Sequence, residues 1–326
     1  CGIFSCMSKI HEKSPCCRGK IRLFGTRRRQ CSTCKKTWRV WKRKRGRKER
    51  RSSFHTLFQY LKGTRISGSL KPRTASARLR KMLRCFNKQT KWTAIPAGPL
   101  IAVADAMIEY IEKRPYAIYF ILVRPINGSQ AFILPPLMLP GGESGWNKAF
   151  EEIPADIFAR IVALVCDGHN SLVYNAKRFG WLLQRCHFHL SARIAHNVSF
   201  GPVGKNRRLG IKIQKLAHIV LYKKEISLVD EALDEIKKIK EVITSRNFRS
   251  VLSGFIKHYK DYRTYLEFPL HLLPSTSNSA EHLVGLIRDL QYRARGFRTP
   301  DSLFSWVSGF CKYQKSVTCR PKIQPN

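Results

Sequence analysis

The chain has 326 residues, and its 61 Lys and Arg against 21 Asp and Glu give a formal net charge of +40. A hydrophobic share of 43% supplies a core of ordinary size, which excludes a basic tail without folded structure. No run of about 20 apolar residues occurs, which excludes a membrane-spanning helix, and the excess positive charge predicts a nucleic acid partner rather than an anionic membrane surface.

The charge is concentrated in the first part of the chain. Residues 1–95 hold 29 Lys and Arg but only two acids. This part shows no secretory signal with an apolar segment, so the eleven cysteines are expected to be reduced thiols or metal ligands. We therefore expect a cytoplasmic protein that associates with nucleic acid.

Residues 1–41 form a cysteine-rich segment. A C-x-x-C pair stands in "QCSTCKK", and two adjacent cysteines lie upstream in "SPCCRGK". Tetrahedral zinc commonly takes four thiolates from two such pairs, so a zinc ribbon is expected. Its predicted ligands are Cys16, Cys17, Cys31 and Cys34. Cys6 or His11 could replace one of the upstream pair, and the alternative is a C-x-x-C pair without metal.

Residues 42–53 are predicted to be a basic linker that lies along phosphates. The segment 54–95 is predicted to hold two helices with a turn between them, the second beginning near Thr74 or Ser76. Two basic helices in this order favour a helix-turn-helix, whose second helix enters the major groove of DNA. The arginines expected to contact DNA from the linker and the second helix are Arg43, Arg45, Arg47, Arg78, Arg80 and Arg84.

Apolar runs from residue 96 onward predict the strands of a catalytic domain, 96–315. Three runs come first, "GPLIAVADA", "PYAIYFILVRP" and "SQAFILPPLML", and Asn127–Gly128 between the last two favours a hairpin turn. A helix, the strand "ARIVALVCD", a second helix and the short strand "GWLLQRC" follow. The order β-β-β-α-β-α-β is typical of an α/β (α+β) fold with the later strands parallel to the first.

Helix-patterned sequence interrupts this order from about residue 190 to about residue 270, which predicts an all-helical insertion. A further helix follows in "STSNSAEHLVGLIRDLQYRARGFRT". It carries Glu281 in its first turn, where a carboxylate suits the helix dipole, and Arg288, which is also expected to contact DNA, two turns later on the same face. Residues 316–326 are expected to be a tail.

Three acids stand out by position. Asp105 is expected to end the first strand and Asp167 the fourth, and these strands are neighbours in the predicted sheet, so their carboxylates should lie side by side. With Glu281 from the late helix they offer the oxygen ligands that Mg²⁺ prefers. The alternatives are that Asp167 only forms a turn and that Glu281 only favours the helix start. Glu109 and Glu112 are the nearest rivals of Asp105.

The order Asp, Asp, helical insertion, Glu resembles the DDE transposases of bacterial insertion sequences, especially the Mutator-like group. The resemblance rests on "AVADAM", on "VCDGH", on the C-x-x-H pair Cys186 and His189 in "CHFHL", and on the late helix. It implies a ribonuclease H-like core preceded by a zinc ribbon and a helical DNA-binding domain. Cys186 and His189 would be a structural pair near the site, and His187 is expected at the surface.

The resemblance implies an enzyme that binds the terminal repeats of its element as a homo-oligomer on double-stranded DNA. Two Mg²⁺ ions, which Mn²⁺ can replace, would be held by Asp105, Asp167 and Glu281 for phosphodiester hydrolysis and transesterification. One alternative is a sequence-specific DNA-binding protein without catalysis, either a decayed transposase or a repressor. Another is a zinc-ribbon RNA-binding protein, which predicts stacking aromatic residues on a sheet face.

Overall fold

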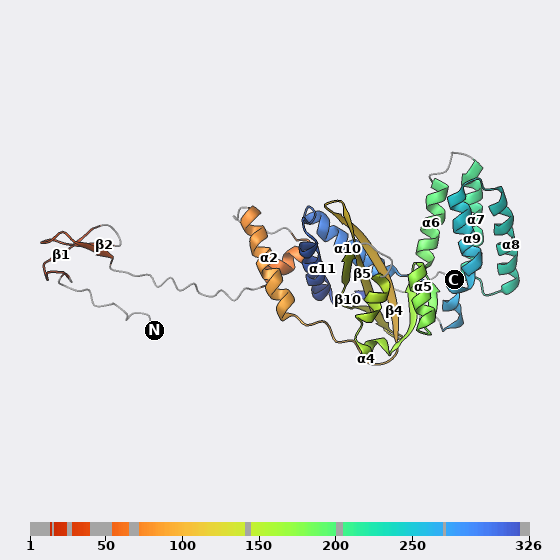
Figure 1. The fold of residues 1–326 in the computed structure, drawn as a ribbon, viewed down its shortest axis with the longest axis horizontal. Coiled ribbons are helices and arrows are strands. Elements are labelled where there is room, and N and C mark those ends of the chain that lie inside the picture. The colour runs from red at the N-terminus through yellow and green to blue at the C-terminus, as the bar shows by residue number, and fades with distance from the viewer. Residues whose placement is uncertain are drawn as a thin grey trace, which may run out of the picture. The chain divides into compact units, whose positions relative to one another are not determined.

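The computed structural model of the chain divides into two compact units, residues 1–53 and 54–326 (Figure 1). The described residues are 14, 16–24, 28–39, 54–64, 72–140, 145–199, 205–269 and 272–319. The basic linker 42–53 therefore lies outside them, as do Cys6 and His11. No helix in these ranges is long and apolar enough to cross a membrane.

The N-terminal unit contains a small antiparallel sheet. Its strands are β1 (Ile21–Leu23), β2 (Arg28–Cys31) and β3 (Thr37–Arg39), in that order. Ile21 pairs with Cys31, which places the end of β2 beside the start of β1. The turn after β2 closes with Lys35 at a φ of 59°, and the amide of Cys31 donates to the carbonyl of Lys36 at 2.9 Å.

A seven-stranded mixed sheet organises the larger unit. Its strands are β4 (Leu100–Ile111), β5 (Arg114–Pro125), β6 (Gln130–Ile133), β7 (Leu137–Pro140), β8 (Ile161–Cys166), β9 (Leu182–Arg185) and β10 (Ser316–Thr318). The order is β10-β6-β5-β4-β8-β9, and β7 pairs with β5. β4, β8 and β9 run parallel, whereas the other pairings are antiparallel. This arrangement is compatible with a ribonuclease H-like core.

Alternate side chains of the sheet enter two separate cores, as the two-residue period of a strand requires. Val103 and Met107 belong to one core, while Ala102 and Ala104 belong to the other. Helices cover both faces (Figure 1). The first core takes side chains from α1 (His55–Leu61), α2 (Pro72–Gln89), α10 (Asn278–Arg293) and α11 (Pro300–Gln314); the second takes them from α3 (Gly145–Glu151), α4 (Ala155–Phe158) and α5 (Asn170–Arg178).

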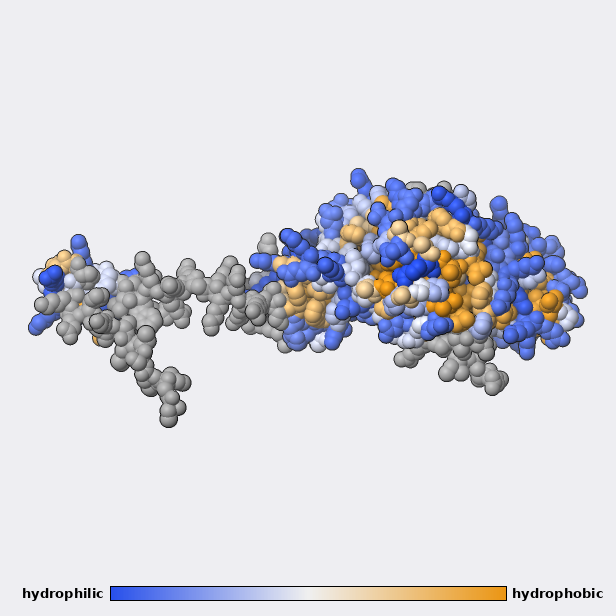
Figure 2. Space-filling view, turned by 90° about the horizontal axis from the view of Figure 1, so that it is seen from below, coloured by the Kyte–Doolittle hydropathy of each residue, from blue (hydrophilic) through white to orange (hydrophobic). Residues whose placement is uncertain are grey.

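The helical insertion has a core of its own. It consists of α6 (His187–Ser199), α7 (Lys205–Tyr222), α8 (Ile226–Val242) and α9 (Arg246–His258), followed by the 3₁₀ turns η1 (Tyr259–Tyr262) and η2 (Thr264–Glu267). In Figure 1 these helices stand together beyond the sheet, and Figure 2 shows mostly hydrophilic side chains over their visible surface. The Thr264 hydroxyl donates to the carbonyl of Leu183 at 2.7 Å, which attaches the insertion to β9.

Several element boundaries differ from those expected. The first strand does not end at Asp105, because β5 continues to pair with it as far as Ile111 opposite Arg114. The third apolar run divides into β6 and β7, since the two prolines at 135–136 cannot donate ladder hydrogen bonds. The tail predicted from residue 316 begins with β10, in which Val317 pairs with Ala131 of β6.

The two helices of the predicted helix-turn-helix are part of the larger unit. α2 begins at Pro72 rather than at Thr74 or Ser76, and the fixed φ of proline suits a first helical turn. The Asn87 amide donates to the carbonyl of Ser305 at 2.8 Å. Lys312 donates to the carbonyl of Asn87 at 2.6 Å. These contacts hold α2 against α11, so residues 54–95 do not form a separate compact unit.

Candidate active site and cysteine cluster

The register of the parallel strands brings Asp105 and Asp167 to the same place on neighbouring strands. The β4–β8 ladder ends at the pair Val103–Val165, and each aspartate lies two residues beyond it. Both valines enter the core that α10 also lines. Asp105 remains in β4, opposite Phe120 of β5, and its Oδ1 accepts from the amide of Ala106 at 2.9 Å.

Asp167 begins a tight turn at the end of β8. Its Oδ1 accepts from the amide of His169 at 2.8 Å, and Gly168 has a φ of +87° that only glycine adopts without strain. A Cβ on Gly168 would approach Nη1 of Arg185 to 3.0 Å. The turn-forming role foreseen for Asp167 is therefore present, and it orients the carboxylate without using its second oxygen.

Glu281 reaches the site from the first turn of α10, which begins after the buried Ser277. Its Oε1 accepts from the Ser277 hydroxyl at 2.8 Å and from the Cys186 thiol at 3.5 Å. Nδ1 of His189 lies 3.3 Å from the same oxygen. The C-x-x-H pair of the β9–α6 junction thus contacts Glu281 directly, and Ser277 is a contact that the sequence did not indicate.

Electrostatics shows that these groups sense one another. The pKa of Asp105 is raised to about 6, chiefly by burial and to a smaller extent by the negative charges of Asp167 and Glu281. The hydrogen bond from Ala106 and the charge on His189 act in the opposite direction. The charges of Asp167, Glu281 and His189 therefore all act on Asp105, and the three acids are called the acidic cluster below.

The rivals of Asp105 lie elsewhere. Glu109 is four residues farther along β4, which is about 13 Å at the rise of a strand. Its carboxylate accepts from the Gln291 amide at 2.6 Å. Glu112 is exposed in the turn between β4 and β5, with a φ of 51°.

The cluster fits hard divalent cations. Its donors are carboxylate oxygens, which Mg²⁺ and Mn²⁺ prefer. Burial is the largest cause of the raised pKa of Asp105, and the negative charges of Asp167 and Glu281 add to it; a cation beside Asp105 would offset both effects. By donor type Asp105, Asp167 and Glu281 suit such ions, and Oε1 of Glu281 already has three neighbours.

The four predicted zinc ligands of the N-terminal unit converge. The Sγ atoms of Cys16 and Cys34 lie 3.2 Å apart, as do those of Cys17 and Cys31. All four sulfurs lie within 4.8 Å of one another. The hydrogen bond to Ser14 is the main cause that lowers the pKa of Cys31 to about 5, which favours a thiolate. This cluster can hold a metal such as zinc, and the adjacency of Cys16 and Cys17 does not prevent it.

The predicted DNA-contacting arginines within the described ranges are exposed. Arg78, Arg80 and Arg84 project from α2, and Arg288 projects from α10. Arg288 also lines a hollow at the end of α10 with Tyr292, whose side chain is 87% exposed. The linker arginines, Arg43, Arg45 and Arg47, lie outside the described residues.

His187 does not lie at the surface. It is buried, and its Nε2 contacts the carbonyl of Tyr262 at 2.7 Å. The rings of Tyr222 and Tyr265 pack against it edge-on. Burial lowers the pKa of His187 to about 4, which favours the neutral ring, and the ring packs within the core of the insertion.

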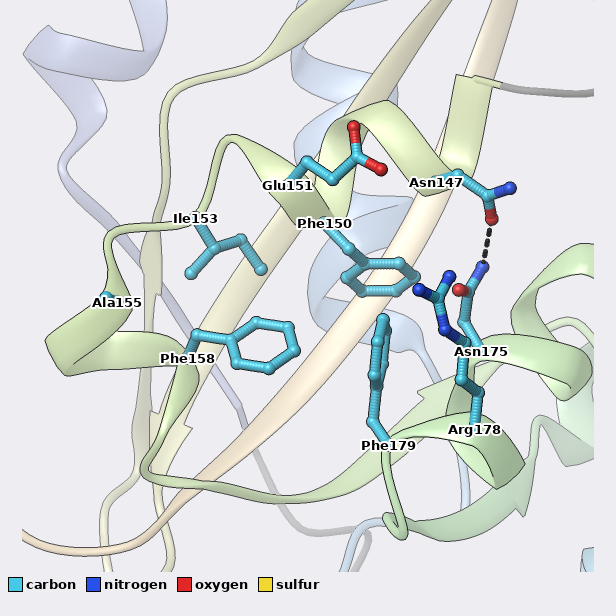
Figure 3. A pocket seen from close by; sticks show the side chains of 9 residues that line it. All are labelled: Asn147, Phe150, Glu151, Ile153, Ala155, Phe158, Asn175, Arg178 and Phe179. Carbon is cyan, nitrogen blue, oxygen red and sulfur yellow. Dashed lines mark hydrogen bonds between the residues drawn. The ribbon is translucent and has the colours of Figure 1, made fainter.

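A pocket of about 280 Å³ lies on the other face of the sheet, between α3, α4 and α5 (Figure 3). The rings of Phe150, Phe158 and Phe179 line it. Asn175 donates to Oδ1 of Asn147 at 2.7 Å at its polar end. In the space-filling view hydrophobic side chains gather on this face of the larger unit (Figure 2). The pocket belongs to the second core and is separate from the acids.

Comparisons with known proteins find similarity to solved structures only. No family model matches the chain, and no curated protein matches it. Twelve chains of solved structures match. One of them is the Drosophila P element transposase strand transfer complex, to which this chain is similar with 12% identity and a TM-score of 0.24, over 80% of this chain and 82% of that chain.

Proposed function

We propose that this protein is a DDE-type transposase of the Mutator-like group that its sequence resembles. It would cut DNA at the ends of its element and join the freed 3′-hydroxyl to target DNA. The observation that supports the proposal is the β4–β8 ladder, which ends at Val103–Val165, two residues before Asp105 and Asp167; the charge of Glu281 also acts on Asp105, in a chain with a net charge of +40. Three of the few acids in a basic chain would lie near one another if they held the cations that act on DNA phosphates.

Each residue of the cluster has a distinct structural task. Asp105 is carried by a strand that is paired on both sides at the neighbouring Val103, which makes it the most rigid of the three. Asp167 is oriented by its hydrogen bond to the amide of His169. Glu281 is held by Ser277 and by the C-x-x-H pair.

These three carboxylates would hold two Mg²⁺ ions, which when bound activate the attacking oxygen and stabilise the leaving oxygen. No covalent protein–DNA intermediate is required, so no serine or tyrosine nucleophile is assigned.

DNA binding would use charge outside the cluster. Arg78, Arg80 and Arg84 form an exposed basic face on α2, suited to contact phosphates or base edges. Arg288 stands on the same helix as Glu281, so it can bind a phosphate close to the reacting one. We propose that the N-terminal unit and the basic linker contribute further contacts, and that the protein acts as a homo-oligomer on the DNA of a prokaryotic nucleoid.

The test compares the full chain with Asp167→Asn on labelled DNA from both flanks of its own coding sequence. Asparagine keeps the turn-forming oxygen but loses the negative charge, so the variant should bind the end fragment with near-normal affinity and yield no cleavage or joining product in Mg²⁺ or Mn²⁺. Asp156→Asn, an exposed acid on α4, is the matched control and should cut like wild type. Cleavage by Asp167→Asn would show that Asp167 only forms the turn, whereas a wild-type chain that binds the end fragment without cutting it would be a DNA-binding protein without catalysis.

A further inference from the structure

Three side chains of different chemistry meet at the N-terminus of α10. They are the thiol of Cys186, Nδ1 of His189 and Oε1 of Glu281, and these three atoms lie within 4.8 Å of one another. Cys186 is buried at the end of β9, and His189 lies one helical turn later in α6. Glu281 comes from a helix 95 positions farther along the chain.

The separations fit one tetrahedral ion. Zinc lies about 2.3 Å from sulfur and about 2.0–2.2 Å from nitrogen and carboxylate oxygen. At tetrahedral angles these lengths place sulfur about 3.5 Å from oxygen and nitrogen about 3.3 Å from oxygen. The observed separations are 3.5 Å between Cys186 Sγ and Glu281 Oε1 and 3.3 Å between His189 Nδ1 and the same oxygen.

His189 supplies a second, independent observation. Its Nδ1 is buried and, among the described residues, has no partner in hydrogen-bond geometry, although the carboxylate is near enough in distance. A buried ring nitrogen in this position is costly unless something binds it. A cation placed between nitrogen, sulfur and oxygen would satisfy it.

The donor set selects the kind of ion. One sulfur, one imidazole nitrogen and one carboxylate suit zinc, whereas Mg²⁺ takes oxygen ligands only. On binding, the Cys186 thiol would release its proton to solvent, so thiolate, carboxylate and Zn²⁺ sum to zero charge in a buried place. The amide of Ser277 already donates to Cys186 Sγ at 3.2 Å, an outer contact that stabilises a metal-bound thiolate.

We propose that Cys186, His189 and Glu281 bind one Zn²⁺ ion, separate from the N-terminal cysteine cluster and from the Mg²⁺ ions of the proposed reaction. The ion would tie the start of α10 to the β9–α6 junction. All described contacts of the Glu281 carboxylate are made by Oε1, so zinc on Oε1 leaves Oε2 for the acidic cluster. This consequence for catalysis rests on the proposed function, whereas zinc binding itself does not.

The test counts zinc in the purified full chain in the absence of DNA. Wild type should carry two equivalents, and Cys31→Ser with Cys34→Ser should carry one, because the N-terminal site is removed. Adding Cys186→Ser should remove the remaining equivalent. Adding Cys85→Ser, a partly buried thiol outside both clusters, should leave it in place.

Cobalt identifies the ligands. In the Cys31→Ser/Cys34→Ser chain, Co²⁺ should give a thiolate charge-transfer band and the intense visible bands of four-coordinate cobalt, and both should vanish on adding Cys186→Ser. If Cys186→Ser fails to fold, Glu281→Gln keeps the shape and should weaken binding at least tenfold. The zinc site is overturned if the Cys31→Ser/Cys34→Ser chain holds no metal. It is also overturned if that chain still holds metal after Cys186 and Glu281 are changed. The proposed function is scored separately, by DNA cleavage.

Discussion

The raised pKa of the buried Asp105 carboxyl leads to a prediction about how stability depends on pH. Burial and the neighbouring acids raise the pKa of Asp105 from 3.8 to about 6. The folded chain therefore binds this proton more tightly than the unfolded chain does. The resulting penalty is absent below the unfolded pKa of 3.8, develops between pH 4 and 6, and is fully present above pH 6.

The magnitude follows from the difference of about 2 between the two pKa values. Each pKa unit corresponds to about 1.4 kcal/mol. The ionised carboxylate of Asp105 therefore lowers the free energy of unfolding by about 3 kcal/mol at pH 7.5 without divalent cations. Asp105→Asn removes the charge and can still accept from the Ala106 amide. It should therefore raise the stability of the larger unit by up to about 3 kcal/mol at pH 7.5, and by little at pH 4.

Urea unfolding monitored by tryptophan fluorescence measures this difference in a buffer free of divalent cations. Asp289→Asn, an exposed acid on α10, serves as the control and should change the stability by less than about 0.5 kcal/mol. Added Mg²⁺ should stabilise the wild type but not Asp105→Asn. Equal stability of variant and wild type at pH 7.5, or an equal gain at pH 4 and pH 7.5, would refute the idea of an uncompensated acidic cluster.

The remaining predictions concern DNA. Neutralising several basic residues in 42–51 should weaken binding to all duplexes and flatten the salt dependence, by about 0.9 in slope for each phosphate that is no longer neutralised. Changing Arg78 and Arg80 to alanine should instead lower the preference for the element's own ends over random DNA in competition binding. Arg246 and Arg249 on α9, also exposed, give the control pair. If the linker changes and the Arg78 and Arg80 changes both weaken binding equally on specific and random DNA, α2 does not recognise sequence.

Local patterns in the sequence predicted the sheet well. The apolar runs around Asp105 and Asp167 indicated two neighbouring strands, and the observed ladder through Val103 and Val165 explains why two residues 62 positions apart lie at the same level. Parallel strands of this kind read as continuous apolar runs, which are visible without any structure. The C-x-x-C pair likewise marked the cysteine cluster.

Contacts made by tertiary packing could not be predicted in this way. The extension of β4 to Ile111 depends on pairing with β5, and Asp105 itself interrupts the apolar run that marked the strand. The contact between Cys186 and Glu281 spans the whole insertion, so no spacing rule announces it. His187 is a polar residue between Cys186 and Phe188 in the sequence, yet three tyrosine rings pack around it.

Catalysis as proposed here requires that Asp105, Asp167 and Glu281 share divalent cations. The most direct measurement is an anomalous difference map, at the manganese edge, from crystals of the chain soaked in Mn²⁺. Two peaks about 3.5–4 Å apart, with the two aspartates as common ligands and Glu281 beside one of them, are the expected result. Manganese bound elsewhere only, with Asp105 directed away from Asp167, would contradict the proposed active site.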